Sequence, residues 1–314
     1  MPIPAHEVEH RRDVLDTADG HHIHVQSWLP SQDLTAVIQV LHGLGEHADR
    51  YARFAAMASR RGYALYVHDH RGHGRRTPHA GHLADHAGWQ YLVDDAHRVT
   101  QLICERHSNR NIVLLGHSMG SYVAQSYAMR HGDEICGLIL SASTWPSRAQ
   151  LLPARVLARI ETWRVGRRGK SALLDKLGFG NFNRKFEPAR SAFDWLSRDA
   201  QEVDQYISDP LCGGPYSCGL WQDLLGGLWQ ISGDSAIKSI PATLPILITG
   251  GSEDPVGGEK GMSKLAARYA RCGHQHLKLK LYAGGRHEML NEINRDDVSR
   301  DWLDWIDATT GSER

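Results

Sequence analysis

The sequence is poor in cysteine and contains no long hydrophobic run. Its five cysteines are scattered and odd in number, without Cys-x-x-Cys spacing, so we predict reduced thiols rather than a disulfide framework. No stretch reaches the ~18 uninterrupted apolar residues of a membrane span. The first 16 residues carry several charges and are unlike a secretory signal. These absences predict a cytoplasmic protein.

The chain also lacks a surplus of charge of either sign. Its 36 Lys and Arg balance 36 Asp and Glu, which gives no reason to expect nucleic acid or a strongly acidic partner. Histidine is abundant at 20, but no His-Glu-x-x-His or similar ligand spacing occurs, so we expect no metal. Surface and turn-fixing roles are expected instead for the clustered histidines, which are His68, His70, His73, His79, His82 and His86.

A predicted strand that ends in a serine turn is the most informative feature present. The apolar run 112–115 leads into Gly116-His117-Ser118-Met119-Gly120, and helix formers follow at 122–128. This pattern predicts a buried strand that turns sharply into a helix, with Ser118 at the apex. The helix N-terminus there favours negative charge. A chance Gly-x-Ser-x-Gly in a loop would lack both flanking elements, so we interpret Ser118 as a nucleophile.

Predicted strands and helices alternate along most of the chain. Strands are expected at 36–41, 64–68, 112–115, 137–142, 244–249 and 277–282, with helices between them and a hairpin over 11–29. This alternation predicts a mostly parallel sheet covered by helices on both faces. It stops between about residues 145 and 240. We therefore predict a core formed by residues 1–144 and 241–314, with a lid or cap insertion over 145–240. The insertion is expected after the sixth or seventh strand, over the strands' carboxyl ends, where ligands bind.

A serine nucleophile needs a base and a group that orients the base. In hydrolases with this serine turn the chain order is Ser, acid, His, each beyond a strand. Asp254 and His287 occupy two such loops. Asp254 is preferred to Glu253 because it is the last acid before the Pro255 turn, and Glu253 remains the alternative. Either residue alone fits a turn or an exposed loop, but three residues at three strand ends favour a triad.

Backbone N–H groups are expected to bind the oxyanion that forms during attack. Met119 follows the nucleophile, and Leu44 lies in an early glycine-rich loop, between Gly43 and Gly45. The two glycines allow that loop to approach the substrate closely. Loss of one such donor typically raises the barrier by ~3–4 kcal/mol.

These residues resemble the monoacylglycerol lipase and lysophospholipase branch of the serine α/β-hydrolases, over most of the chain. The segments that carry the resemblance are 42–47, 68–74, 116–120 and 208–211. The serine turn is shared by many esterases, whereas Glu46-His47 and Ser208-Asp209-Pro210 are more specific. The resemblance implies an α/β-hydrolase fold with an inserted helical lid. It also implies a cofactor-free enzyme that cleaves an ester bearing one acyl chain.

The resemblance extends to substrate contacts. Glu46, Arg50 and Tyr206 match positions that the family places near the glycerol end of the substrate. His117, beside the nucleophile, is expected to be a fourth substrate contact. The head group stays open between a neutral monoacylglycerol and an anionic lysophospholipid.

The start of the insertion combines apolar and basic residues at helical spacing. The apolar positions are Leu151, Leu152, Val156, Leu157, Ile160 and Trp163, and seven basic residues interleave them. Such a helix can rest on an anionic membrane surface, as a peripheral contact. The same pattern fits a helix that packs on its own domain and solvates its basic face.

Two other functions stay open. An aminopeptidase-type enzyme would use the same triad on an amide, but it needs an acidic anchor for the substrate amine, and the expected lid is basic. A non-catalytic binding protein would use the pocket without turnover. Such proteins often lose a triad residue, and here all three are present.

Overall fold

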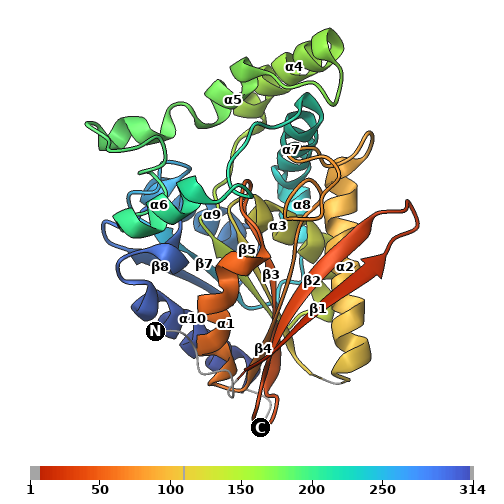
Figure 1. Cartoon of the computed structure of the whole chain (residues 1–314). Helices are drawn as coiled ribbons and strands as arrows, with labels where there is room; N and C mark the ends of the chain where they lie inside the picture. Colours follow the sequence, from red (N-terminus) through yellow and green to blue (C-terminus); the bar gives the residue numbers. More distant parts are fainter. Residues whose placement is uncertain (1–7, 109, 312–314) are drawn as a thin grey trace.

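The computed structural model describes residues 8–108 and 110–311. Eight strands form one sheet in the order β1-β2-β4-β3-β5-β6-β7-β8 (Figure 1). Their bounds are β1 Val8–Asp16, β2 His22–Pro30, β3 Ala36–Leu41, β4 Tyr63–His68, β5 Ile112–His117, β6 Gly137–Ser141, β7 Ile246–Gly251 and β8 Leu277–Tyr282. β1 and β2 pair antiparallel with their neighbours, and the pairs from β4 to β8 are parallel. The predicted mostly parallel sheet is confirmed.

Helices cover both faces of the sheet, as the buried apolar strands require. One face packs against α2 (Gly88–Arg106), α3 (Met119–His131) and α9 (Gly258–Arg271). The other face packs against α1 (Ala52–Ser59) and α10 (Arg295–Thr310). Neighbouring strand residues point to opposite faces: Leu114 belongs to the first hydrophobic cluster and Val113 to the second. The sheet edges are exposed and charged, which discourages pairing with another chain.

The insertion follows β6 and consists mainly of helices. They are α4 Arg148–Val165, α5 Ala172–Phe179, the short helix η3 Phe182–Phe186, α6 Ala200–Ser208, α7 Cys218–Ile231 and α8 Asp234–Lys238. In Figure 1, α4 and α5 lie at the top, beyond the end of the sheet where β5 passes into α3, and α6 lies below them at the left. α7 instead packs on α2 and α3, and its Leu220 and Leu224 join the main hydrophobic cluster. The first half of the insertion is therefore the part that stands above the strand ends.

Most strands begin and end within a few residues of the bounds predicted from the sequence. α1 follows directly on the 3-10 helix η1 (Ala48–Tyr51) and ends at Ser59. Gly62, with φ +81°, follows that helix and starts the turn into β4. Among the described residues, no helix is both long enough and apolar enough to cross a membrane.

Candidate active site

Ser118 lies at the sharp turn between β5 and α3. Its backbone angles, φ 52° and ψ −118°, are strained for a residue with a side chain. The flanking glycines make this turn sterically allowed. A Cβ on Gly120 would overlap the carbonyl group of Leu41, and one on Gly116 would lie 2.6 Å from the Cα of Ser121. The strand-turn-helix predicted around Ser118 is thus present, and it projects the hydroxyl beyond the sheet.

The structure brings Ser118, His287 and Asp254 into one hydrogen-bonded line. His287 Nε2 lies 2.9 Å from Ser118 Oγ, and His287 Nδ1 lies 2.9 Å from Asp254 Oδ1. Because a carboxylate only accepts hydrogen bonds, the proton of a neutral His287 resides on Nδ1. Nε2 is then left to accept from the serine hydroxyl, which is the arrangement a general base requires.

The surroundings of His287 raise the pKa of its imidazole. Burial alone would lower the pKa of His287, but the charge and hydrogen bond of Asp254 outweigh it and raise the pKa above its ordinary value. Asp254 is itself buried and accepts a backbone N–H from Val256 at 2.9 Å. Glu253, the alternative acid, points away: its side chain is 45% exposed and pairs with Lys185 at 2.5 Å.

The glycine-rich loop after β3 packs directly against the serine turn. A Cβ on Gly43 would lie 3.3 Å from the Cβ of Ser118, so only glycine permits this approach. The N–H of Gly43 donates to Glu46 Oε1 at 2.5 Å, and the N–H of Gly45 donates to His73 Nε2 at 3.2 Å. Leu44 lies between these two anchored residues, and the loop beside Ser118 is held at both of its ends.

Buried histidines fix this loop. His42 Nδ1 donates to the carbonyl of Gly43 at 2.8 Å, while His42 Nε2 accepts the backbone N–H of His70 at 2.9 Å. The exposed fractions of His68, His70 and His73 are only 0%, 1% and 6%, and burial lowers the pKa of each. The surface role expected for these three residues is wrong, because the loops around them fold inward against β3 and the serine turn.

The four predicted substrate contacts surround the triad in a buried polar cluster. Arg50 donates to Glu288 Oε2 at 2.6 Å, and its guanidinium lies 4.9 Å from the ring centre of Tyr206. Glu46 accepts from the hydroxyl of Tyr51 at 3.0 Å. A very small cavity of about 20 Å³ is lined by Glu46, Arg50, His117 and Glu288, among others.

His117 lies directly beside the imidazole of His287. Its ring centre is 5.0 Å from that of His287. Burial lowers the pKa of His117 to about 4, so this ring is neutral near pH 7 and adds no positive charge next to the base.

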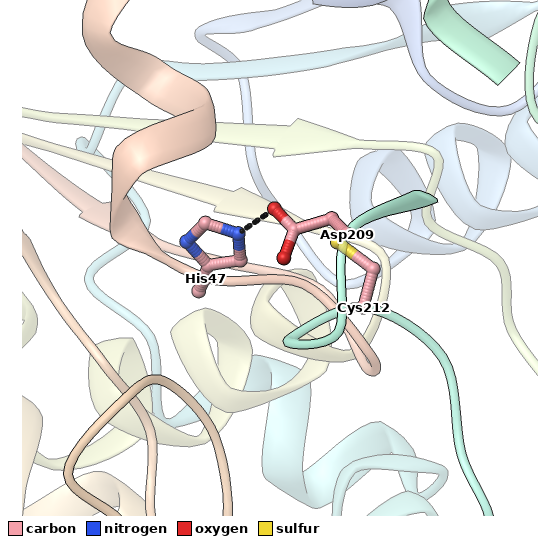
Figure 2. Close-up of side chains that lie close together, drawn as sticks. All are labelled: His47, Asp209 and Cys212. Atoms are coloured by element: carbon pink, nitrogen blue, oxygen red, sulfur yellow. Dashed lines mark hydrogen bonds and ion pairs between the residues drawn. The ribbon is translucent and has the colours of Figure 1, made fainter. Parts of the chain in front are cut away.

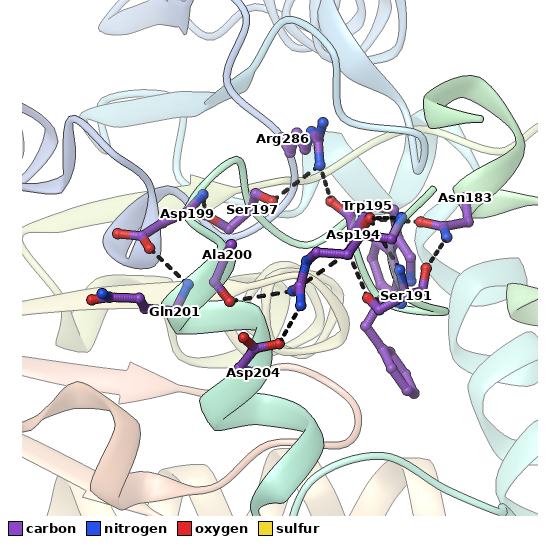
Figure 3. A network of polar contacts seen from close by, with 12 residues as sticks. Asn183, Ser191, Asp194, Trp195, Ser197, Asp199, Ala200, Gln201, Asp204 and Arg286 are labelled. Atoms are coloured by element: carbon purple, nitrogen blue, oxygen red, sulfur yellow. Dashed lines mark hydrogen bonds and ion pairs between the residues drawn. The ribbon is translucent and has the colours of Figure 1, made fainter. Parts of the chain in front are cut away.

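The insertion is tied to this site by two sets of contacts. His47, from the loop after β3, lies 2.8 Å through Nε2 from Asp209 Oδ2 (Figure 2). The two segments that the family resemblance marked as more specific therefore meet. Further along, the segment 194–198 supports the loop of His287 (Figure 3): the N–H of Glu288 donates to the carbonyl of Leu196 at 2.8 Å.

Two functional features were missed by the sequence reasoning. One is Glu288, whose carboxyl group binds Arg50; burial raises the pKa of Glu288, against the attraction of the guanidinium. The other is the segment 194–198, where Arg286 donates to the carbonyls of Asp194 and Ser197 (Figure 3). No local motif marks that segment. Glu288 could have been suspected from its position directly after His287.

An apolar cavity of about 350 Å³ lies near the triad. Its aromatic lining is Phe179, Phe193, Trp195, Tyr206 and Tyr216, and Leu44 also lines it. The ring centre of Trp195 is 5.0 Å from that of His287, so one wall of the cavity contacts the imidazole. A volume of this size suits a small apolar ligand.

Comparison with known proteins identifies the family. The family model described as "Serine aminopeptidase, S33" matches residues 32–294. The chain belongs to this family of hydrolases. The family model and the solved structures confirm the predicted α/β-hydrolase fold. The named relatives confirm the predicted class, a carboxylic ester hydrolase.

Curated relatives and solved structures match nearly the whole chain. A monoacylglycerol lipase of Mycolicibacterium smegmatis is 28% identical over 280 residues, covering 89% of this chain and 90% of that protein. A monoglyceride lipase of Rattus norvegicus is 28% identical over 303 residues, covering 93% and 86%. The crystal structure of a thermostable carboxyl esterase from Bacillus coagulans, in complex with glycerol, superposes with a TM-score of 0.89 at 24% identity, covering 96% and 99%.

Proposed function

We propose that this protein hydrolyses carboxylic esters of lipids with one acyl chain, through Ser118, His287 and Asp254 and an acyl-enzyme. The observation that carries the proposal is the unbroken hydrogen-bonded line from Ser118 Oγ to Asp254, next to an apolar cavity whose lining residue Trp195 contacts His287. The names of the relatives support the substrate class.

In acylation, Ser118 Oγ attacks the ester carbonyl carbon while His287 Nε2 takes the hydroxyl proton. The carbonyl oxygen becomes an oxyanion, which the N–H groups of Leu44 and Met119 bind. Met119 is the first residue of α3, and the first N–H groups of a helix lack partners within it. His287 then gives its proton to the alcohol oxygen, the C–O bond breaks and the alcohol leaves.

In deacylation, water takes the place of the alcohol. His287 removes a proton from the water, and the resulting hydroxide attacks the acyl carbon. The second oxyanion uses the same two N–H groups. When it collapses, Ser118 recovers its proton from His287 and the fatty acid leaves. Asp254 keeps the imidazole in the correct tautomer and stabilises its cation in both halves of the reaction.

The polar cluster suits a neutral head group. Arg50 is 12% exposed and bound to Glu288, and it also lies in the field of Glu46. Its positive charge is therefore already compensated, which leaves little to attract a phosphate. The acyl chain occupies the aromatic cavity, and the glycerol end faces Glu46, Arg50 and Tyr206. A monoacylglycerol fits this distribution of polarity better than a lysophospholipid.

The same ion pairing disfavours an aminopeptidase. An amine-binding site needs a carboxylate free to pair with the substrate ammonium. The two carboxylates nearest the triad, Glu46 and Glu288, both lie in the field of Arg50. The family description includes aminopeptidases, so amide substrates belong in the experimental test.

A substrate panel tests this proposal. Purified protein is assayed on monoacylglycerols, lysophospholipids, simple esters and aminoacyl amides. We expect the highest kcat/KM on monoacylglycerols, and a loss of roughly 10⁴-fold or more in Ser118→Ala. Faster cleavage of aminoacyl amides, or retained activity in Ser118→Ala, would overturn it.

We further propose that α4 lies on an anionic membrane surface. Leu152, Val156, Ile160 and Trp163 are spaced along one stripe of the helix, with exposed fractions of 53%, 48%, 51% and 87%. Residues on the opposite side, such as Leu151 and Ala158, are buried. The alternative is that the apolar face of α4 packs on its own domain. That alternative does not account for the four exposed apolar side chains. Basic side chains along the helix suit anionic lipids.

Vesicle binding tests the membrane proposal with a matched pair of variants. Ile160→Ser removes an apolar side chain from the stripe, whereas Ile293→Ser makes the same change at a site of similar exposure, 60%, away from α4. We expect roughly five- to tenfold weaker binding to phosphatidylglycerol vesicles for Ile160→Ser, and unchanged binding for Ile293→Ser. Equal binding of both variants, or equal binding to neutral vesicles, would refute the contact.

A further inference from the structure

A second group of chemically reactive side chains lies next to the polar cluster. His47 follows β3, and Asp209 and Cys212 follow α6 (Figure 2). His47 Nε2 lies 2.8 Å from Asp209 Oδ2, and the candidate ligand atoms of all three side chains lie within 4.8 Å of one another. The hydrolytic mechanism uses none of these three residues.

We propose that His47, Asp209 and Cys212 form a binding site for a divalent transition-metal ion, with Zn²⁺ the best fit. An imidazole nitrogen, a carboxylate oxygen and a thiolate sulfur are all ligands that Zn²⁺ accepts. Zinc–ligand distances of roughly 2.0–2.3 Å place tetrahedral ligands roughly 3.3–3.7 Å apart. Small side-chain rotations reach that spacing from the present one.

The surroundings leave room for a fourth ligand. A concavity of about 270 Å³ is lined by His47, Asp209 and Cys212 together with residues of α6. Three protein ligands and one water complete a four-coordinate zinc site. The thiol of Cys212 releases its proton to solvent as the sulfur–metal bond forms, so each ion bound displaces one proton.

The other nitrogen of His47 supports the same assignment. His47 Nδ1 lies 3.7 Å from Asp49 Oδ2, and Asp49 Oδ1 accepts from Gln26 Nε2 at 2.7 Å. Metal-binding histidines usually direct their second ring nitrogen to a carboxylate that is itself held by hydrogen bonds. Because a carboxylate only accepts, His47 Nε2 donates its proton to Asp209 in this structure. An ion at Nε2 would move that proton to Nδ1, on the side of the ring that faces Asp49.

Arg50 is the unfavourable neighbour, and its charge is compensated. Its guanidinium lies 3.9 Å from Cys212 Sγ, but it is bound to Glu288 at 2.6 Å. Burial raises the pKa of the Cys212 thiol to about 12, and the Arg50 guanidinium only partly opposes that rise, so the bound ion itself has to drive loss of the thiol proton. The ion would approach the sulfur from the side of His47 and Asp209.

Metal binding would connect the core with the insertion, because His47 and Asp209 are 162 residues apart in the chain. That separation also explains why ligand spacing in the sequence gave no sign of a metal. A second group, His97, His131 and Glu134, is more exposed and contains no sulfur.

Cobalt spectroscopy distinguishes the two groups. Co²⁺ bound by a thiolate gives a sulfur-to-metal charge-transfer band in the near ultraviolet, which a site of His and Glu cannot give. We expect the full-length protein to develop this band up to one equivalent of Co²⁺, and Zn²⁺ to abolish it. Cys212→Ser should lose the band. Cys104→Ser, which removes an exposed thiol elsewhere, should keep it.

A further variant tests the role of Asp49. Asp49→Asn is expected to weaken Co²⁺ binding by roughly ten- to a hundredfold while the band remains. A wild-type protein without the band, or a band that survives in Cys212→Ser, would overturn the proposal. The readout is spectroscopic and needs no substrate, so its failure is distinguishable from failure of the proposed hydrolysis.

Discussion

Replacement of Asp254 by asparagine tests the electrostatic design of the triad. Asp254 Oδ1 lies 2.9 Å from His287 Nδ1 and as a carboxylate can only accept. An amide presents a donor as well, so Asp254→Asn allows the histidine proton to sit on Nε2, where it blocks transfer from Ser118. The side-chain volume and the fold are retained.

The expected loss is large because the contact is short and buried. The corresponding substitution in a serine protease lowers kcat by about 10⁴-fold, or about 5.5 kcal/mol of barrier. Asp254 is 4% exposed, so water cannot replace the lost charge, and we expect a loss of roughly 10³- to 10⁴-fold. The pH profile should also move. Burial, which lowers the pKa of His287, persists while the raising effect of Asp254 is lost, so the acid limb of the residual activity shifts to lower pH.

The assay is kcat/KM on a medium-chain p-nitrophenyl ester across a pH series. Glu253→Gln is the matched control, since Glu253 pairs with Lys185 at the surface, and it should change activity less than about twofold. Retention of more than a tenth of wild-type activity in Asp254→Asn would refute this reasoning, and so would a severe defect in Glu253→Gln.

Two further predictions concern stability. Gly120→Ala places a methyl group against the carbonyl of Leu41 and should destabilise the fold by about 3 kcal/mol or more, whereas Gly226→Ala, with open space around it, should be neutral or stabilising by up to about 1 kcal/mol. Equal melting temperatures for these two variants would contradict the packing described for the serine turn. His68 has its pKa lowered from 6.5 to about 3 by burial. Below pH 6.5, His68 therefore binds a proton in the unfolded chain but stays neutral in the folded chain, and the free energy of unfolding falls as pH falls. At pH 4.5 this amounts to about 2–3 kcal/mol, so His68→Phe should lose that much less stability than wild type between pH 7 and 4.5 in urea unfolding. Parallel stability curves would show that His68 is not the group responsible.

The features that sequence predicts well here are local. The β5 strand, the serine turn and α3 follow from one short stretch, in which the hydrophobic run and the two glycines carry the information. The loops that hold Asp254 and His287 were found because a mostly parallel sheet places its carboxyl ends at one edge. Once the strands are placed, proximity of these side chains follows from topology.

The features that sequence did not predict depend on partners far apart in the chain. Arg50 and Glu288 are 238 residues apart, so nothing local in the sequence indicates that these two side chains form an ion pair. The burial of His68, His70 and His73 arises because β4, which ends at His68, is a central strand and the loop after it hydrogen-bonds to the loop after β3. The insertion lacks the strand–helix alternation, so nothing in it marked 194–198 as the support of the His287 loop.

Labelling with a fluorophosphonate tests the central claim most directly. This reagent phosphonylates serines that an adjacent base has activated, and peptide mass mapping locates the product. We predict a single modification, on Ser118, that disappears in Ser118→Ala and is slowed by orders of magnitude in Asp254→Asn. An unlabelled wild-type protein, or a label on a different serine, would contradict the account.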